Sequence, residues 1–473
     1  MALPTSMVAH QPEDINYAYL LHLLSTPPCL PTSTTVRNHL LAAVTSRTDL
    51  FSASLDSLSV IDDPWKDFTT RYQPGAQLVV IGSPPVGVLK SGRGGSSSSS
   101  ANNGHQAGIW GLGILVSSKF RDEADPTTCL RRPNMSIWLS TEMACSARGE
   151  DDPTTRGMVH FLFSQWLPVA YKRFIEAQRD HFALDASEVE REHLREVDII
   201  IQAMDELQVD VLADEVCQAR RDEDSLRGPS SNRPWIEWRS GAYDAFVLDP
   251  PPIVCPATPE EEAKQAGQRW QLERITTQTA KAVAEANKIP FPVSHTLRKP
   301  HLSLLARDAT GPVGAAGAQK GSEEDVYPIE QAKGSLAGWV YTHEDMSLAS
   351  LHVALPYRRR VEPADSTASS AAPPPAPLSL GRLLVTLLSP RIGLAQRRAL
   401  TACGVDVAAI EAEATQGEGT WCPWPVTAHV DASDQGAVRF YEKLGCTRMA
   451  KHVWLGLKAP LRGAGDQASS RTG

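Results

Sequence analysis

The sequence predicts an α/β fold in two domains, and three observations carry this prediction. Apolar runs typical of strands alternate with stretches of helical periodicity along the 473 residues. Low-complexity tracts interrupt the chain and separate its folded parts. An apolar run from Val426 to Val430 leads into a well-marked helix that ends at Gly445. Because a chain of 473 residues is longer than one ordinary domain, we expect two folded domains with long loops.

The first part of the chain, residues 1–255, is expected to form an N-terminal α/β domain. A Ser/Gly-rich loop at 91–104 separates its first two strands, and the residues between 186 and 226 show an amphipathic pattern of mixed charge that predicts a solvated helix or helical pair. The other expected elements are strands at Gln77 to Ile81, Gly108 to Ser117 and Trp235 to Val247, and a helix at Arg156 to Arg179.

Residues 256–458 are expected to form the second domain. Thr258-Pro259-Glu260-Glu261 is a capping box, and it predicts a helix that runs to about Asn287. Gly/Ala-rich and Ala/Pro/Ser-rich tracts predict insertions at 308–334 and 361–378, and residues 459–473 are expected to be a disordered tail. The expected strands are His301 to Ala306, Ser335 to Thr342, Leu348 to Leu355, Val426 to Val430 and His452 to Leu457.

The composition excludes several classes of function. Hydrophobic residues make up 42% and charged residues 21%, which is ordinary for a globular protein. The net charge of -9 argues against a nucleic-acid partner, because phosphate binding needs a basic face. No apolar stretch is long enough to span a membrane, so we expect a soluble protein without a membrane partner. The eight cysteines form no C-x-x-C pair and the N-terminus has no secretory pattern, which favours the cytoplasm, with the nucleus as an alternative.

An interrupted loop after the predicted hairpin at 335–355 has the residues of a phosphate-binding turn. The chain continues as Pro356-Tyr357-Arg358-Arg359-Arg360 and, beyond the insertion at 361–378, as Ser379-Leu380-Gly381-Arg382. A glycine-bearing turn at a helix start directs several backbone N–H groups and the positive end of the helix dipole into one space. Arginines add charge-assisted hydrogen bonds. With the insertion set aside, the two pieces predict a site for a diphosphate.

The last predicted helix carries a second motif. Asp434 can cap its start, and Ala437, Phe440, Tyr441 and Leu444 recur at three- and four-residue steps before Gly445. This order after a strand resembles the C-terminal signature of the GNAT acyltransferases, the general-control-related N-acetyltransferases. The resemblance covers about residues 286–457, and Trp339-Val340-Tyr341 with Tyr357-Arg358-Arg359-Arg360 resembles the glycine N-acyltransferase-like branch. It implies a GNAT-type mixed, largely antiparallel sheet flanked by helices.

The resemblance also implies a reaction and a set of residues. The chain would be an acyl-CoA-dependent N-acyltransferase, with acetyl-CoA as the commonest donor, a small amine or amino acid as acceptor, and no metal. Tyr441 would protonate the departing thiolate, and His352 is a candidate general base beside Glu344 and Asp345. The cofactor-binding residues would be Leu351, His352, Val353, Arg358, Arg359, Arg360, Leu380, Gly381, Arg382, Asp434, Ala437 and Tyr441.

Other interpretations of the same residues remain open. Tyr441 can be an aromatic that packs its helix, and His352 can be a histidine satisfied by a neighbour. Ser379 and Asp434 stand where the family has glycine and asparagine, and the insertion interrupts the loop. The alternatives are therefore a degenerate GNAT-fold protein that acts as a binding or scaffold module, and an acetyltransferase of protein lysines or N-termini. The oligomeric state stays open.

Overall fold

The computed structural model divides the chain into two compact units. Unit 1 comprises Met1–Val247, Arg398–Pro423 and His429–Gly473, and unit 2 comprises Leu248–Arg397 and Trp424–Ala428. The described residues are 8–30, 32–45, 58–90, 109–118, 132–141, 153–182, 198–206, 208–214, 235–248, 269–287, 293–297, 299–309, 335–358, 379–416 and 421–458. The expected domain boundary at residue 255, most of both insertions, the Ser/Gly-rich loop and the tail lie outside them.

Unit 1 is built on a mixed sheet in which antiparallel pairs predominate. Its strand order is β1-β2-β3-β4-β5-β13-β7, and β6 also pairs with β13. Only one of its described pairs is parallel, that of β4 with β5, where Asn134 is opposite Ile200. The bounds are β1 (Ala9–His10), β2 (Gln77–Gly82), β3 (Trp110–Ser118), β4 (Arg132–Leu139), β5 (Asp198–Asp205), β6 (Trp235–Arg239), β7 (Tyr243–Leu248) and β13 (Thr447–Lys458).

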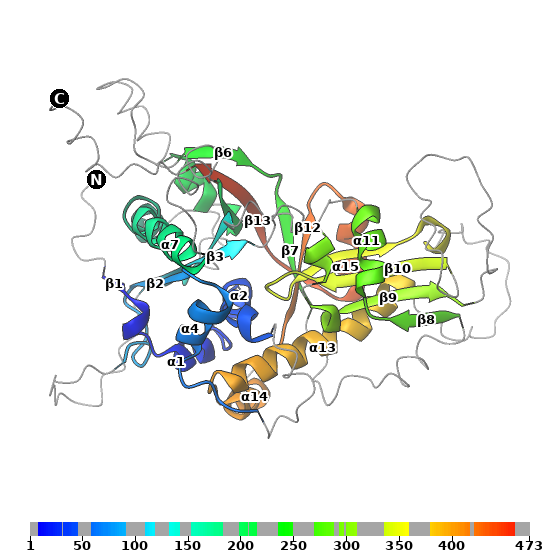
Figure 1. Cartoon of the computed structure of the whole chain (residues 1–473), viewed down its shortest axis with the longest axis horizontal. Helices are drawn as coiled ribbons and strands as arrows, with labels where there is room; N and C mark the ends of the chain where they lie inside the picture. Colours follow the sequence, from blue (N-terminus) through cyan, green and yellow to red (C-terminus); the bar gives the residue numbers. More distant parts are fainter. Residues whose placement is uncertain are drawn as a thin grey trace. The chain divides into compact units, whose positions relative to one another are not determined.

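Helices cover both faces of this sheet. Figure 1 shows α7 on one face and α2 on the other. The face under α7 holds a large apolar core, in which Phe174, Ile199 and Leu455 are completely buried. The helical segments are α1 (Tyr17–Leu23), α2 (Thr34–Thr45), α4 (Pro64–Asp67), α6 (Pro153–Phe161), α7 (Leu167–Phe182), α14 (Val407–Gln416) and α15 (Gln435–Leu444), with short segments at Pro12–Asp14, Phe68–Tyr72 and Leu162–Trp166.

The predicted elements of unit 1 meet different outcomes. The strands at 77–81 and 108–117 and the helix at 156–179 are confirmed. The helix or helical pair expected across 186–226 is wrong at Asp198–Asp205, which form β5, whereas residues 208–214 are helical. Three successive β-branched residues, Ile199 to Ile201, favour a strand, and Ile199 and Ile201 are buried in the core beside β13. The single strand expected at 235–247 is two strands, β6 and β7, joined by a short turn.

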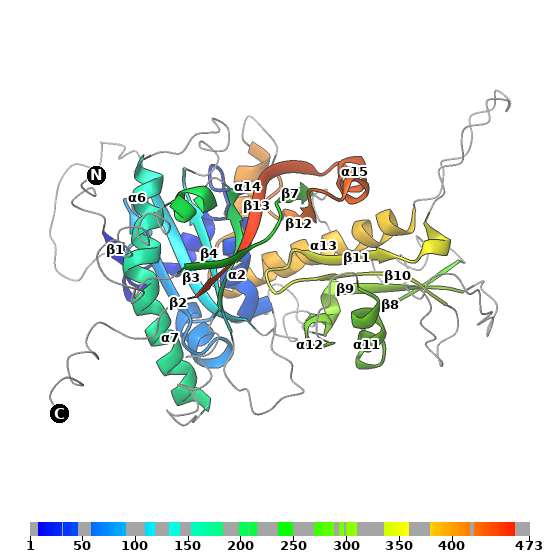
Figure 2. The same cartoon turned by 90° about the horizontal axis from the view of Figure 1, so that it is seen from above.

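In unit 2 the strands pair in the order β12-β11-β10-β9-β8, and β12 belongs to this unit through its residues up to Ala428. Leu348 of β11 pairs with Ala428 of β12 in parallel, and the other pairs are antiparallel. Figure 2 shows β10 and β11 between α13 and α11. The bounds are β8 (Trp270–Glu273), β9 (Ser303–Asp308), β10 (Ser335–Thr342), β11 (Leu348–Val353), β12 (Val426–Asp431), α11 (Thr277–Ala286), α12 (Val293–Thr296) and α13 (Leu380–Ala402), with 3-10 turns at Pro300–Leu302 and Leu355–Tyr357.

All five strands expected after residue 300 are present, with bounds that differ by a few residues. The helix expected from 258 to 287 is wrong in its middle, because β8 lies at 270–273 and the helix begins only at Thr277. Its capping box is formed by Thr276 and Thr279. The side chain of each threonine accepts a hydrogen bond from the backbone N–H of the other. The predicted box at Thr258 to Glu261 lies outside the described residues. The α/β class with a mixed, largely antiparallel sheet flanked by helices is confirmed.

The same order of elements occurs twice along the chain. An antiparallel group of three strands, β2-β3-β4, is followed by the helices α6 and α7 and by β5, which is parallel to β4. The group β9-β10-β11 is likewise followed by α13 and by β12, which is parallel to β11. Among the described residues, α1, α2 and α4 precede the first group, and α11 and α12 precede the second. None of the helices in the described parts is long and apolar enough to cross a membrane.

Candidate functional site

The helix α15 presents the motif that the sequence singled out. The Asp434 carboxylate accepts a hydrogen bond from the Ala437 amide at 3.0 Å, which satisfies one of the N–H groups left open at the helix start. Gly445 ends the helix in the left-handed conformation, with φ of 89°. Both capping predictions are therefore confirmed in geometry. They fix the position of Tyr441 on the face of the helix that is turned toward β7.

Tyr441 is buried, with 8% of its surface exposed. Its ring stacks on Phe246 of β7 at a centroid distance of 5.6 Å and an interplanar angle of 20°. Burial, and next the nearby Cys446, raise the pKa of the Tyr441 hydroxyl above its usual value. The hydroxyl therefore keeps its proton at neutral pH. Tyr441 can both pack its helix and donate a proton, because its ring contacts Phe246 and its hydroxyl carries the proton.

The strand pair β10 and β11 carries the predicted pantetheine-binding strand. Leu351, His352 and Val353 are half-buried, and Trp339 lies directly opposite His352 in the register. The two rings are nearly parallel, with centroids 4.2 Å apart and an interplanar angle of 7°. Gly338 is opposite Val353, and a Cβ at that position would lie 2.6 Å from the His352 carbonyl oxygen. Glycine is thus required for this close approach.

A polar network that the sequence did not indicate holds this strand pair to α11. Asn287, at the end of α11, accepts hydrogen bonds from Trp339 Nε1 at 3.0 Å and Ser350 Oγ at 2.9 Å. Its Nδ2 donates to the Tyr341 hydroxyl at 2.8 Å. The sequence named Asn287 only as a helix end, because nothing local connects it to strands more than fifty residues later.

The predicted phosphate loop is described at its two ends. Arg358 donates from Nε to the Val353 carbonyl at 2.7 Å, so its guanidinium lies beside the end of β11. On the other side α13 begins at Leu380, and the Leu383 amide bonds to the Ser379 carbonyl at 2.9 Å. Gly381 and Arg382 thus lie in the first turn of α13, as predicted. Arg359 and Arg360 lie outside the described residues, and the closure of the loop stays a prediction.

Two further observations concern the histidine, cysteine and acidic side chains of the described residues. No group of three or more histidine, cysteine, aspartate or glutamate side chains is arranged there to hold a metal ion. Cys29 and Cys403 are buried, and burial raises the pKa of each thiol to about 12. These two cysteines stay protonated at neutral pH and are poor nucleophiles.

The predicted site residues divide between the two units. Asp434, Ala437 and Tyr441 belong to unit 1, while Leu351 to Val353, Arg358 and Leu380 to Arg382 belong to unit 2. Within unit 1 the cap and the tyrosine share one helix. Within unit 2 the strand β11, Arg358 and the start of α13 follow one another along the chain. The binding and catalytic roles expected for both sets stay predictions.

No family model matches the chain, and no curated protein matches its sequence. Among solved structures, a Drosophila protein covers 96% of this chain and 99% of its own length, with 12% identity and a TM-score of 0.40. A putative GNAT-family acetyltransferase from Novosphingobium aromaticivorans covers 49% and 70%, with 12% identity and a TM-score of 0.24. A tandem GNAT protein from the clavulanic acid biosynthesis pathway covers 89% and 96%, with 11% identity and a TM-score of 0.29. Because all three TM-scores are below 0.5, the description of the fold depends on the strand pairing of this chain and not on these neighbours.

Proposed function

We propose that this chain is an acyl-CoA-dependent N-acyltransferase of the GNAT superfamily, in its glycine N-acyltransferase-like branch. The observation that carries the proposal is the β12–α15 segment. A strand, a helix cap, a tyrosine and a glycine follow one another there in the order of the signature that the sequence resembles, with Asp434 in the place of the family's asparagine. The donor would be acetyl-CoA or another acyl-CoA, and the acceptor a small amine or amino acid. The reaction needs no metal.

The residues of unit 2 would bind the coenzyme. Backbone groups of Leu351, His352 and Val353 would bond to the pantetheine amides, and an amide of this strand would hold the thioester carbonyl oxygen. The diphosphate would lie at the first turn of α13, where N–H groups without an intrahelical partner meet the positive end of the helix dipole. The basic residues available to it are Arg358, Arg359, Arg360 and Arg382, with Leu380 and Gly381 supplying backbone.

Tyr441 would act as the acid. The acceptor nitrogen loses a proton to a base, attacks the thioester carbon, and forms the new C–N bond. The intermediate then collapses as the C–S bond breaks, the sulfur takes a proton from Tyr441, and the nitrogen releases its second proton to solvent, from which the Tyr441 hydroxyl is protonated again. Because burial raises the pKa of Tyr441, its hydroxyl is protonated at neutral pH and has a proton to donate when the thiolate forms. His352 is the candidate base named by the sequence. Asp434 and Ala437 would place the helix start beside the coenzyme.

Thiol release from acetyl-CoA tests the proposal, with amines of several classes offered as acceptors. Tyr441→Phe is expected to lower kcat by about 10²- to 10⁴-fold, while acetyl-CoA still binds. Phe440→Leu, on the same helix, is the matched control and is expected to keep its kcat. Equal loss in both variants would show that helix packing, rather than proton donation, sets the rate.

A second function is favoured by the interrupted phosphate loop. If the insertion at 361–378 prevents closure of the loop, the chain would be a GNAT-fold binding module without catalysis. Deleting residues 361–378 separates the two functions. Binding of coenzyme A by either form supports the enzyme, whereas two folded forms that both fail to bind support the module. Transfer to lysine side chains or N-termini of peptides, but not to free amines, would support the protein acetyltransferase.

A further inference from the structure

A cluster of aromatic rings and a guanidinium lies at one end of the unit 2 sheet. The Arg269 guanidinium carbon is 4.6 Å from the ring centroid of Trp270 and 5.8 Å from that of Tyr357. The two rings meet edge-on, with centroids 5.5 Å apart and an interplanar angle of 80°. The Tyr357 hydroxyl is 2.6 Å from Ser335 Oγ, and this hydrogen bond anchors the ring. We call these residues the Trp270 cluster.

The Trp270 cluster is accessible to solvent. The Arg269 side chain is 57% exposed, and both aromatic side chains are half-buried. Trp270 belongs to β8, the last strand in the order of this sheet, so no described strand covers its outer edge. By contrast, Trp339 of β10 is only 2% exposed, and its indole N–H is bound by Asn287. The cluster therefore presents aromatic surface and a cation to a ligand that comes from solvent.

Strand register places the cluster on a defined face of the sheet. Trp270 and Ser335 are both opposite Asp308 of β9, so their side chains share one face. Gly338 is opposite Ala306, which lies two residues before Asp308 and therefore on the same face. Trp270, Ser335 and Gly338 thus belong to one face of the sheet.

The start of α13 lies on this face as well. The Leu380 Cδ2 atom is 3.3 Å from the position that a Cβ would take at Gly338, so the first turn of α13 packs beside that glycine. Ser335 is three residues before Gly338 on β10, which is roughly 10 Å of extended chain. Arg358 follows the cluster directly in the chain and bonds to the end of β11. The Trp270 cluster and the residues proposed for the diphosphate are therefore neighbours within unit 2.

These parts of unit 2 follow one another in the order of the parts of coenzyme A. In the proposed function, the pantetheine amides bond to β11 and the diphosphate lies at the first turn of α13. Beyond its diphosphate, coenzyme A continues into an adenosine 3′-phosphate. β11 ends at Val353, and the chain then turns through Leu355–Tyr357 into the cluster. A ligand that extends beyond the diphosphate in this direction meets the two rings and Arg269.

The chemistry of the cluster suits a purine nucleotide with a phosphate monoester. Purine bases stack on aromatic rings and on guanidinium planes, and the cluster offers both. A guanidinium carries several N–H donors in a planar fork. Among the described residues, Asp308 makes the only ion pair of Arg269, at 3.6 Å. The other edges of this guanidinium are suited to the oxygens of a phosphate.

We propose that the Trp270 cluster is the subsite for the adenosine 3′-phosphate of the coenzyme, with the adenine stacked on Trp270 and Tyr357 and the 3′-phosphate bound by Arg269. The inference rests on the proposed acyl-CoA-dependent function, and all of its residues lie in unit 2. Arg269 is then a specificity-determining residue, because it distinguishes coenzyme A from dephospho-coenzyme A, which lacks the 3′-phosphate.

Isothermal titration with coenzyme A and dephospho-coenzyme A tests the inference. The wild type is expected to bind coenzyme A at least about 10-fold more tightly than dephospho-coenzyme A. Arg269→Gln is expected to bring this preference close to one, because it removes the contact to the 3′-phosphate. Trp270→Leu is expected to weaken the binding of both ligands by about 5- to 150-fold, because both carry the adenine.

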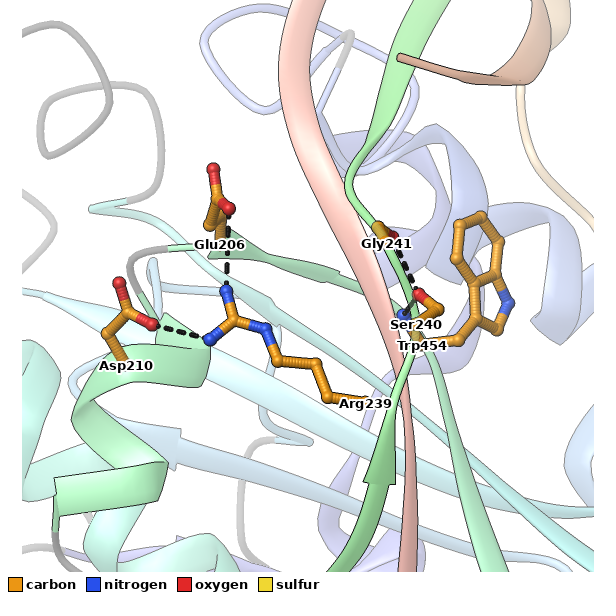
Figure 3. Close-up of polar contacts among 6 residues, drawn as sticks. All are labelled: Glu206, Asp210, Arg239, Ser240, Gly241 and Trp454. Carbon is orange, nitrogen blue, oxygen red and sulfur yellow. Dashed lines mark hydrogen bonds and ion pairs between the residues drawn. The ribbon is translucent and has the colours of Figure 1, made fainter. Parts of the chain in front are cut away.

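Unit 1 supplies a matched control for each variant (Figure 3). Arg239 is a partly exposed arginine with ion pairs to Glu206 at 3.4 Å and Asp210 at 2.9 Å. Trp454 is a half-buried tryptophan that meets Tyr243 edge-on at 4.5 Å, much as the two rings of the cluster meet. Arg239→Gln and Trp454→Leu are expected to keep the wild-type affinity for both ligands. Equal losses in these controls would trace the effect to general destabilisation and would overturn the inference.

The failure of this inference and the failure of the proposed function are distinguishable. A folded wild type that binds neither coenzyme A nor acetyl-CoA contradicts both. If coenzyme A binds, an unchanged affinity in Trp270→Leu or an unchanged preference in Arg269→Gln overturns the inference alone. Binding of adenosine 3′,5′-bisphosphate by a wild type that does not bind coenzyme A would assign the cluster to a free nucleotide, and it overturns the inference as well.

Hydrogen exchange of the wild type decides the question if Trp270→Leu does not fold. Bound coenzyme A is expected to slow exchange in peptides that cover β8 and the turn Leu355–Tyr357. 4′-Phosphopantetheine lacks the adenosine and is expected to leave exchange in these peptides unchanged. Equal protection by the two ligands, or no protection by bound coenzyme A, would contradict an adenosine subsite at the Trp270 cluster.

Discussion

Replacing Asn287 by alanine is expected to loosen the strand pair β10–β11 without affecting unit 1. The substitution removes the acceptor of Trp339 Nε1 and Ser350 Oγ, and the donor to the Tyr341 hydroxyl. Trp339 and Tyr341 are 2% and 1% exposed, so water cannot readily replace the lost partner. Each hydrogen bond contributes about 1 kcal/mol, which gives a loss of about 3 kcal/mol in the free energy of opening this region.

Hydrogen exchange read by mass spectrometry measures this loss locally, which suits a chain of two units that need not unfold together. A loss of about 3 kcal/mol corresponds to roughly 100-fold faster exchange through local opening in peptides that cover β10 and β11. Peptides from β2 in unit 1 serve as an internal reference and are expected to exchange unchanged.

Asn16→Ala is the matched control for this prediction. Asn16 also flanks a helix, because it caps the start of α1 in unit 1, but its side chain accepts only the hydrogen bond of the Tyr19 amide, at 3.2 Å. Its removal is expected to cost about 1 kcal/mol and to leave β10 and β11 protected. If Asn287→Ala exchanged there no faster than Asn16→Ala, the Asn287 network would not be what holds the strand pair to α11.

Three further predictions concern the cap, the strand pair and alkaline pH. Asp434→Ala should lower stability by about 1 kcal/mol and Asp434→Asn much less, as thermal unfolding would report; equal losses would contradict the cap. Gly338→Ala places a methyl group 2.6 Å from a carbonyl oxygen of β11, and should lower the free energy of unfolding in urea by about 1–3 kcal/mol. An unchanged free energy of unfolding would refute the close approach. Because burial raises the pKa of Tyr441, its contribution to stability is present below about pH 10 and is lost as the pH rises further. Tyr441→Phe should therefore lose less stability than the wild type between pH 9 and pH 11, and parallel losses would contradict this.

The parts of the fold predicted correctly are those that local chemistry determines. The start and end of α15 follow from Asp434 and Gly445, each of which acts within its own turn. The strand β10 follows from a short apolar run bounded by turns. By contrast, the error at β5 arose because charged residues flank Ile199 to Ile201 and gave the wider window a helical period. Burial of Ile199 and Ile201 in the core beside β13 decides in favour of the strand.

The contacts that the sequence could not indicate join distant segments. β13, near the end of the chain, pairs with β5, β6 and β7 from its first half. Asn287 meets residues 52 to 63 positions away, and His429 meets His452 across 23 positions. These pairings depend on strand register, which a single sequence does not specify. His352 was named because its strand was recognised, whereas the histidine pair became visible only when β12 and β13 were placed side by side with β7.

Isothermal titration of the full-length protein with acetyl-CoA, with free coenzyme A as the comparison, tests the proposed acyl transfer most directly. Saturable binding with a Kd in the micromolar range, about -8 kcal/mol, is expected for both ligands, because the first turn of α13 and the arginines would hold their common diphosphate. A folded protein that binds neither ligand, before and after deletion of residues 361–378, would contradict the enzyme and leave the binding module as the function of this fold.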